Sequence, residues 1–133
     1  MNQSYLGQLL VGSVVTTMLL LNTSAGLTAE NATEKAPKVP FQYALGYQKY
    51  QQMCASCHGK WGAGSKQGPP LMHPFYKPSH HADAAFYRAA LNGVKAHHWQ
   101  FGNMPPVSGI TKQDMDAIVP YIRWLQREMG VYK

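Results

Sequence analysis

Cysteines and acidic side chains are scarce in this chain. Its 133 residues include only two cysteines and six Asp or Glu, and no charged residue precedes Glu30. Two cysteines exclude a multi-disulfide scaffold and a four-cysteine zinc site. No segment alternates convincingly between apolar and polar residues, so β-sheet folds are not expected. The twelve Lys and Arg residues are scattered without a cluster, so a nucleic-acid-binding surface is not expected either.

The uncharged N-terminal region predicts export from the cytoplasm. Residues 9–21 read LLVGSVVTTMLLL, which has the length of a signal-peptide core and is shorter than the about 20 residues of a membrane-spanning helix. Small residues follow this run and predict a signal peptide over residues 1–25, cleaved after Ala25 or, as a second choice, after Ala29. The region departs from the signal-peptide pattern in having no Lys or Arg before the apolar run. An uncleaved membrane anchor is the alternative. Residues 26–39 are polar and predict a flexible linker before a domain over residues 40–133.

Three segments of that domain show helical periodicity: residues 40–53, 81–92 and 111–129. Glycines and prolines interrupt any regular structure in residues 59–79 and 93–109. Loops of this length are unusual in a small domain unless they have a function. A buried planar cofactor around which the loops wrap would account for them. The pattern therefore predicts an all-α fold with long loops around a cofactor.

The last of these helices has the clearest boundaries. Thr111 and Asp114 resemble a capping box, and Gly130 follows the last apolar position. Pro120 lies inside the helix and predicts a kink, because it removes one backbone hydrogen bond. The expected apolar stripe consists of Met115, Ile118, Val119, Ile122, Leu125 and Met129.

A C-x-x-C-H sequence formed by Cys54, Cys57 and His58 is the strongest signal in the chain. This spacing is typical of covalent haem attachment, because each thiol can add to one haem vinyl group and the imidazole can bind the iron. We therefore expect one haem c bound through Cys54 and Cys57, with His58 as an axial ligand. A zinc site and a thiol redox pair are the alternatives, but neither further cysteines nor a βαβ pattern supports them. Haem attachment of this kind occurs outside the cytoplasm, so the motif and the N-terminal region together predict a bacterial periplasmic protein.

Met104 is the best candidate for the ligand opposite His58. Its loop, Gly102–Pro106, contains two prolines, and a stiff loop can hold a weak thioether donor on iron. The other candidates are Met53, Met72, Met115, Met129 and the remaining histidines. An ordinary buried loop methionine is the alternative interpretation of Met104.

From about Phe41 to Met129 the chain resembles the small single-haem class I c-type cytochromes. Residues 68–71 (GPPL) are similar to the Gly-Pro-x-Leu of that family, and residues 103–106 (NMPP) are similar to its distal methionine loop. The resemblance implies the class I cytochrome c fold and Met104 as axial ligand. It also implies that the Pro69 carbonyl accepts a hydrogen bond from the His58 ring and that Leu71 packs on the haem.

The same resemblance extends to the helices. Gly46 and Tyr50 resemble the glycine and aromatic residue with which the N-terminal helix of the family crosses the C-terminal helix, here near Tyr121 and Trp124. The glycine itself indicates a close crossing, since an internal glycine costs about 1 kcal/mol relative to alanine. Pro120 departs from the family, in which many members have a helix-forming residue.

Several polar and aromatic residues remain without an assigned role. The doublet His97–His98 could bind a second metal such as copper or contact a partner, and we favour a polar loop surface. His80 and His81 are expected at the surface and as a helix cap. Other residues could contact the haem propionates or a partner: Trp61, Tyr76, Trp99, Lys49, Lys60, Lys66 and Lys95.

These observations favour a periplasmic electron carrier with His58 and Met104 on the iron and no small-molecule substrate. The excess of Lys and Arg, a net charge of +6, favours redox partners with acidic docking surfaces and, at most, weak membrane association through those partners. The alternative is a haem enzyme or sensor with an open or bis-histidine iron. A metal-handling protein that uses the histidine doublets is a third hypothesis.

Overall fold

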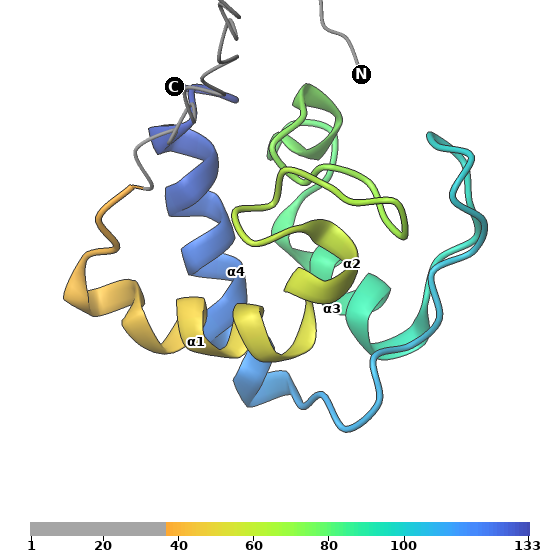
Figure 1. Ribbon diagram of the computed structural model, residues 1–133, viewed down its shortest axis with the longest axis horizontal. Helices are drawn as coiled ribbons and strands as arrows, with labels where there is room; N and C mark the ends of the chain where they lie inside the picture. Colours follow the sequence, from red (N-terminus) through yellow and green to blue (C-terminus); the bar gives the residue numbers. More distant parts are fainter. Residues whose placement is uncertain (1–36) are drawn as a thin grey trace, which may run out of the picture. The chain divides into compact units, whose positions relative to one another are not determined.

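The computed structural model describes residues 37–133 as an assembly of helices joined by long loops (Figure 1). The elements are η1 (Phe41–Tyr43), α1 (Ala44–Met53), α2 (Ala55–His58), η2 (Pro74–Tyr76), α3 (Asp83–Asn92) and α4 (Lys112–Glu128). Within this part of the chain there is no β-strand, so the predicted all-α fold is confirmed. None of its helices combines the length and the apolar character that crossing a membrane requires. The predicted signal peptide and most of the predicted linker lie outside the described residues.

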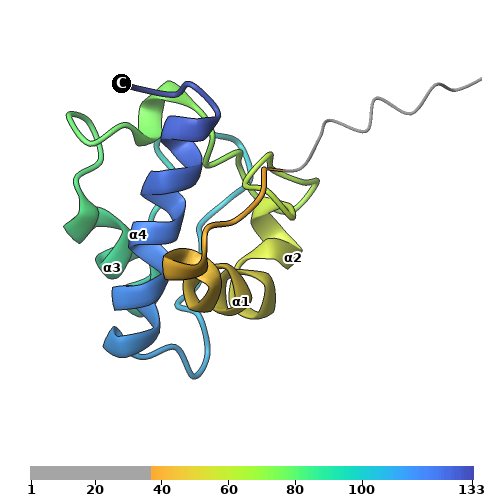
Figure 2. The same ribbon diagram turned by 90° about the vertical axis from the view of Figure 1, so that its left-hand side faces the viewer.

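Helices α1 and α4 cross at close range, as Figures 1 and 2 both show. Gly46 lies at the crossing, where a Cβ atom would come within 2.7 Å of the Tyr121 Cβ and closer still to the Ala117 carbonyl oxygen. Beside it, the fully buried Tyr50 packs against Tyr121 with ring centroids 5.5 Å apart. The crossing near Tyr121 that the family resemblance implied is therefore present, and it requires a glycine because the two backbones leave no room for a side chain.

The start of α4 has the predicted capping box. The Thr111 hydroxyl accepts a hydrogen bond from the Asp114 backbone N–H at 3.2 Å, and Asp114 accepts one from the Thr111 N–H at 2.9 Å. Pro120 is exposed and does not end the helix. Met129 was expected in the core but is 37% exposed, because α4 ends at Glu128 before the stripe reaches it.

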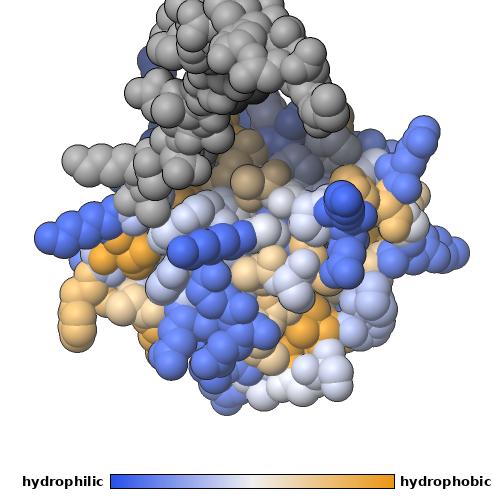
Figure 3. All heavy atoms as spheres, viewed as in Figure 1, coloured by the Kyte–Doolittle hydropathy of each residue, from blue (hydrophilic) through white to orange (hydrophobic). Residues whose placement is uncertain are grey.

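On the face seen in Figure 3, hydrophilic side chains alternate with apolar areas. Three of its aspartates take part in ion pairs. These pairs join Lys49 to Asp114 at 2.9 Å, Lys112 to Asp116 at 2.9 Å, and Arg123 to Asp83 at 2.7 Å. Because so few acidic residues exist and these three are paired, most Lys and Arg side chains contribute uncompensated positive charge.

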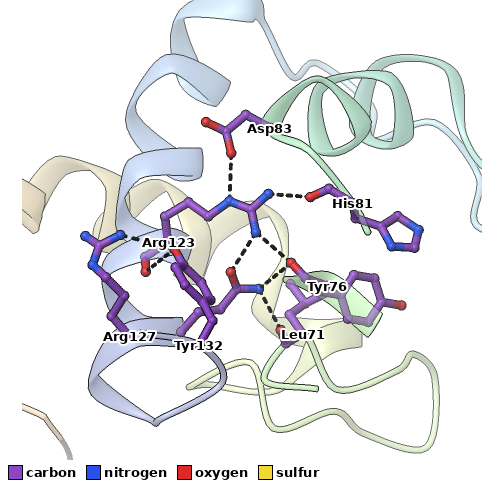
Figure 4. Close-up of polar contacts among 8 residues, drawn as sticks. Leu71, Tyr76, His81, Asp83, Arg123, Arg127 and Tyr132 are labelled. Carbon is purple, nitrogen blue, oxygen red and sulfur yellow. Dashed lines mark hydrogen bonds and ion pairs between the residues drawn. The ribbon is translucent and has the colours of Figure 1, made fainter. Parts of the chain in front are cut away.

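Two buried polar residues of α4 hold the segment from residue 71 to residue 83 (Figure 4). Arg123 is only 5% exposed, and it donates hydrogen bonds to the Asp83 carboxylate at 2.7 Å and to the Tyr76 carbonyl at 2.6 Å. Gln126 donates to the Leu71 carbonyl at 3.0 Å. Backbone carbonyls in an irregular segment need such partners when they are buried. The two side chains thereby fix a loop that forms one wall of the site described next.

Candidate cofactor site

A cavity of about 970 Å³ lies between α2, α3, α4 and the loop over residues 93–107. Its volume is at the upper end of the range of about 300–1,000 Å³ that is usual for ligand pockets. Most of its lining is apolar, with contributions from Leu71, Phe86, Ile118 and Ile122. The helices bury an apolar core that includes Tyr50, Tyr121 and Leu125, and in so small a domain a cofactor in the cavity would add to it.

The C-x-x-C-H sequence forms a single helical turn at the edge of this cavity. Cys54, Cys57 and His58 all line it, and the His58 N–H donates to the Cys54 carbonyl at 2.9 Å. Cys57 is exposed, whereas Cys54 is half-buried. Burial, together with the proximity of Cys57, raises the pKa of the Cys54 thiol to about 11. Before it reacts, Cys54 is therefore a neutral thiol at neutral pH.

His58 is oriented by a backbone carbonyl. Its Nδ1 lies 2.9 Å from the Pro69 oxygen, and because a carbonyl can only accept, Nδ1 carries the proton and Nε2 keeps its lone pair. Burial lowers the pKa of His58, and the hydrogen bond to Pro69 partly opposes this shift. The contact between Pro69 and His58 that the family resemblance implied is present. It leaves a neutral, fixed imidazole whose other nitrogen can bind a metal.

Met104 lies in a loop whose backbone is tightly held. Val94 and Met104 exchange two backbone hydrogen bonds of 2.9 Å. The preceding Gly93 has a φ of 78°, and a Cβ there would come within 2.6 Å of the Met104 carbonyl oxygen. Met104 lines the cavity, as do Met53 and Met115. Of the candidate methionines, only these three line the cavity. Met53 belongs to α1 and Met115 to α4, whereas Met104 lies in a loop.

Trp99 supplies an observation that tests whether haem fits this cavity. Its indole Nε1–H is buried and has no hydrogen-bond partner among the described residues. Burial raises the pKa of the nearby Tyr76 hydroxyl, and Trp99 partly opposes this shift. A buried donor of this kind calls for an acceptor, and haem propionates are acceptors. Trp61, in contrast, does not line the cavity and stacks on Tyr47 with centroids 5.3 Å apart. Two thiols, an oriented imidazole and an unsatisfied donor therefore fit haem c.

The lysines expected around an exposed haem edge have different surroundings. Lys49 is in the ion pair with Asp114, away from the cavity lining. Lys95 lines the cavity. Lys66 belongs to a loop that is bonded to the backbone of Cys57, since the Ser65 hydroxyl donates to the Cys57 carbonyl at 2.6 Å. The basic residues of the cavity lining are therefore Lys95 and Arg88, whereas Lys66 lies in a loop beside Cys57 and Lys49 does not line the cavity.

Comparison with known families identifies this architecture. Residues 43–126 match the family model described as Cytochrome c, and the chain belongs to the cytochrome c family. It is thus a haem c protein that carries electrons, with its haem bound through Cys54 and Cys57. The predictions of the family, the fold and the cofactor are confirmed. Comparisons with the curated proteins and with the solved structures gave no match.

The sequence interpretation missed the proximity of the two histidine doublets. His80 and His81 were expected to cap a helix, but the N-cap of α3 is Ala82, which makes no side-chain capping bond. Instead, the His80 Nε2 lies 3.2 Å from the Nε2 of His98. Four histidines in two adjacent pairs that flank one short helix were the signal available in the sequence. Their meeting depends on the return path of a long loop, which no local pattern specifies.

Proposed function

We propose that this protein is a periplasmic single-haem electron carrier with His58 and Met104 as the two axial ligands of the iron. When bound, the haem supplies a one-electron Fe(III)/Fe(II) couple. Pro69 orients the His58 ring, and the bridge with Val94 holds the Met104 loop. If His58 and Met104 both held the iron, they would leave no position on it for a substrate, so we expect electron transfer without small-molecule chemistry.

The observation that carries the proposal is the combination of a carbonyl-oriented imidazole and a methionine in a pinned loop at one cavity. If His58 and Met104 stay in place when the iron changes oxidation state, little rearrangement accompanies electron transfer. The apolar lining limits the access of water, which is one of the factors that tune the redox potential of such a centre. Both features suit rapid electron exchange better than they suit catalysis.

Its partners are expected to be redox proteins with acidic docking surfaces. Arg88 and Lys95 line the cavity, Lys66 lies in the loop beside the exposed Cys57, and none of them is in an ion pair within residues 37–133. Positive charge near the cavity steers an acidic partner toward it, and this attraction weakens as the salt concentration increases. Membrane association, if any, would arise through such partners.

A periplasmic location is supported by the type of haem attachment and by the apolar, uncharged N-terminal region. Fractionation of cells that produce the whole chain, followed by haem staining, tests it. Haem-bearing protein of reduced mass in the periplasmic fraction is expected. Haem-bearing protein of full length in the membrane fraction would instead indicate an uncleaved anchor.

Replacement of Met104 tests the ligand assignment. In the haem-loaded protein, Met104→Leu should abolish the weak far-red absorption of a methionine–Fe(III) bond and lower the reduction potential, because methionine ligation favours the reduced iron. Met53→Leu is the matched control, since Met53 lines the same cavity but adjoins the attachment motif. An unchanged band and potential in Met104→Leu would show that another residue is the ligand.

A second candidate function is that of a haem enzyme or sensor with an open or bis-histidine iron. The observation that favours it is the presence of His80, His81, His97 and His98 in the cavity lining. The wild-type spectrum distinguishes the two functions. A methionine–Fe(III) band supports the carrier. Its absence, together with binding of cyanide to the oxidised wild type or of carbon monoxide to the reduced wild type, supports the enzyme or sensor.

A further inference from the structure

The two histidine doublets converge on one point at the wall of the haem cavity. His80 and His81 precede α3, and His97 and His98 follow it. One ring nitrogen from each of His80, His81 and His98 lies within 4.8 Å of the others. We call these three residues the histidine triad. All three line the cavity, and none is part of the C-x-x-C-H sequence or of the Met104 loop.

The spacing of the triad is that of ligands around a metal ion. The Nε2 atoms of His80 and His98 are 3.2 Å apart. Two imidazole nitrogens bound to one tetrahedral ion at about 2.0–2.1 Å would lie about 3.3 Å from each other. The third nitrogen, from His81, lies within 4.8 Å of the other two. No carboxylate of the described residues belongs to the group.

Backbone carbonyls orient the rings of this region. The Nδ1 of His81 donates to the Phe75 carbonyl at 2.6 Å, which leaves its Nε2 with a lone pair. His97 donates from Nδ1 to the Lys95 carbonyl at 2.8 Å, and its ring lies against that of His98 with centroids 4.3 Å apart. A metal-binding histidine commonly gives its second nitrogen to such a carbonyl, which fixes the tautomer and the direction of the ring.

The backbone beneath the triad is also held in place. The N–H groups of His80 and His81 both donate to the Lys77 carbonyl at 2.9 Å. The His81 carbonyl in turn accepts a hydrogen bond from the buried Arg123 of α4 (Figure 4). Two of the three ligands therefore start from a segment whose position does not depend on a bound ion. Such pre-organisation lowers the entropic cost of binding.

We propose that the histidine triad binds a divalent late first-row transition-metal ion, with copper(II) the tightest. Neutral imidazoles suit copper, zinc and nickel, and the absence of oxygen ligands disfavours magnesium and calcium. His97 or a water molecule takes the fourth position. The triad is a site separate from the haem, because haem iron has a single position left once His58 is bound, whereas three nitrogens here converge on one point.

Titration of the haem-loaded protein with copper(II) tests the proposal. Calorimetry should show one copper bound per protein, and electron paramagnetic resonance should show hyperfine splitting from nitrogen ligands. His98→Gln should weaken copper binding by at least about 10-fold, because even the loss of a residue that only hydrogen-bonds to a metal ligand reduces affinity by this factor. His73→Gln is the matched control, since His73 is a histidine of the same region outside the triad, and it should bind copper as the wild type does.

Three results would overturn the proposal. The first is the absence of stoichiometric copper binding, and the second is equal binding by the wild type and His98→Gln. The third is a change in the haem spectrum of metal-free His98→Gln, because that would place His98 on the haem iron. If His98→Gln does not accumulate as a folded protein, His80→Gln replaces it, since His80 is exposed. The proposal does not depend on Met104. The histidine variants therefore test the metal site independently of the Met104 and Met53 variants, which test the haem ligand.

Discussion

Replacing Gly46 by alanine should destabilise this cytochrome without altering its haem site. The new Cβ would lie 2.7 Å from the Tyr121 Cβ and overlap the Ala117 carbonyl oxygen. Both obstacles are on or next to the backbone of α4, so they cannot be relieved by rotating a side chain. The two helices must therefore separate or slide where they are packed most closely.

The magnitude follows from two opposing effects. Overpacking in a tight interior costs about 1–3 kcal/mol, and a backbone obstacle places this site at the upper end. Alanine recovers about 1 kcal/mol of helix propensity relative to glycine. The net loss in the free energy of unfolding is thus about 2 kcal/mol, which for a domain of this size corresponds to a decrease in Tm of roughly 8–16 °C.

Urea unfolding of the haem-loaded protein, followed by circular dichroism, measures this loss. Leu45→Ala is the control, because Leu45 is adjacent on α1 but 57% exposed, and a surface change of this kind stays within about 0.5 kcal/mol. The reduction potential of Gly46→Ala should equal that of the wild type, since Gly46 does not line the cavity. A stability equal to or above that of the wild type would refute the close crossing.

Two further predictions concern charged side chains. Arg123→Met should cost about 3 kcal/mol, because it leaves acceptors such as the His81 carbonyl without their donor. Asp83→Asn should cost less than about 1 kcal/mol, because the Asn oxygen can still accept from the Arg123 Nε–H and Asp83 is 63% exposed. Equal losses in urea unfolding would contradict this. Hydrogen bonds from Lys49 and then Thr111 lower the pKa of Asp114 from 3.8 to about 2. Asp114 therefore contributes stability above pH 3.8 that is lost as the pH falls toward 2. The stability difference between the wild type and Asp114→Asn should shrink over that interval, and a difference independent of pH would show that the carboxylate is not the cause.

The features that could be predicted from the sequence are those with local causes. The C-x-x-C-H sequence occupies one helical turn, so its spacing alone determines its chemistry. The capping box of Thr111 and Asp114 is equally local, and both of its hydrogen bonds are present. Clusters of glycine and proline marked the loops, because few other residues fit their backbone conformations.

The features that were missed depend on packing between distant segments. Arg123 and Gln126 are polar residues of α4 and were not expected to be buried, yet the loop from residue 71 to residue 83 covers them and needs their hydrogen bonds. Helical periodicity describes one buried face, whereas α4 is buried on nearly every side from Tyr121 to Gln126. The sequence suggested a metal site at the histidine doublets, but it did not predict that His80, His81 and His98 meet, because a long loop brings them together.

The crossing of α1 with α4 has a consequence for the order of events during biogenesis. A chain is made from its N-terminus, so α1 and the C-x-x-C-H sequence exist well before α4 does. Until α4 arrives, the Gly46 face of α1 has no partner, and contacts between segments so far apart in sequence form late. During that interval Cys54, Cys57 and His58 belong to an open chain. We therefore expect the helix pairing to close after the attachment motif has been accessible, so that a variant that weakens the pairing should still acquire its haem.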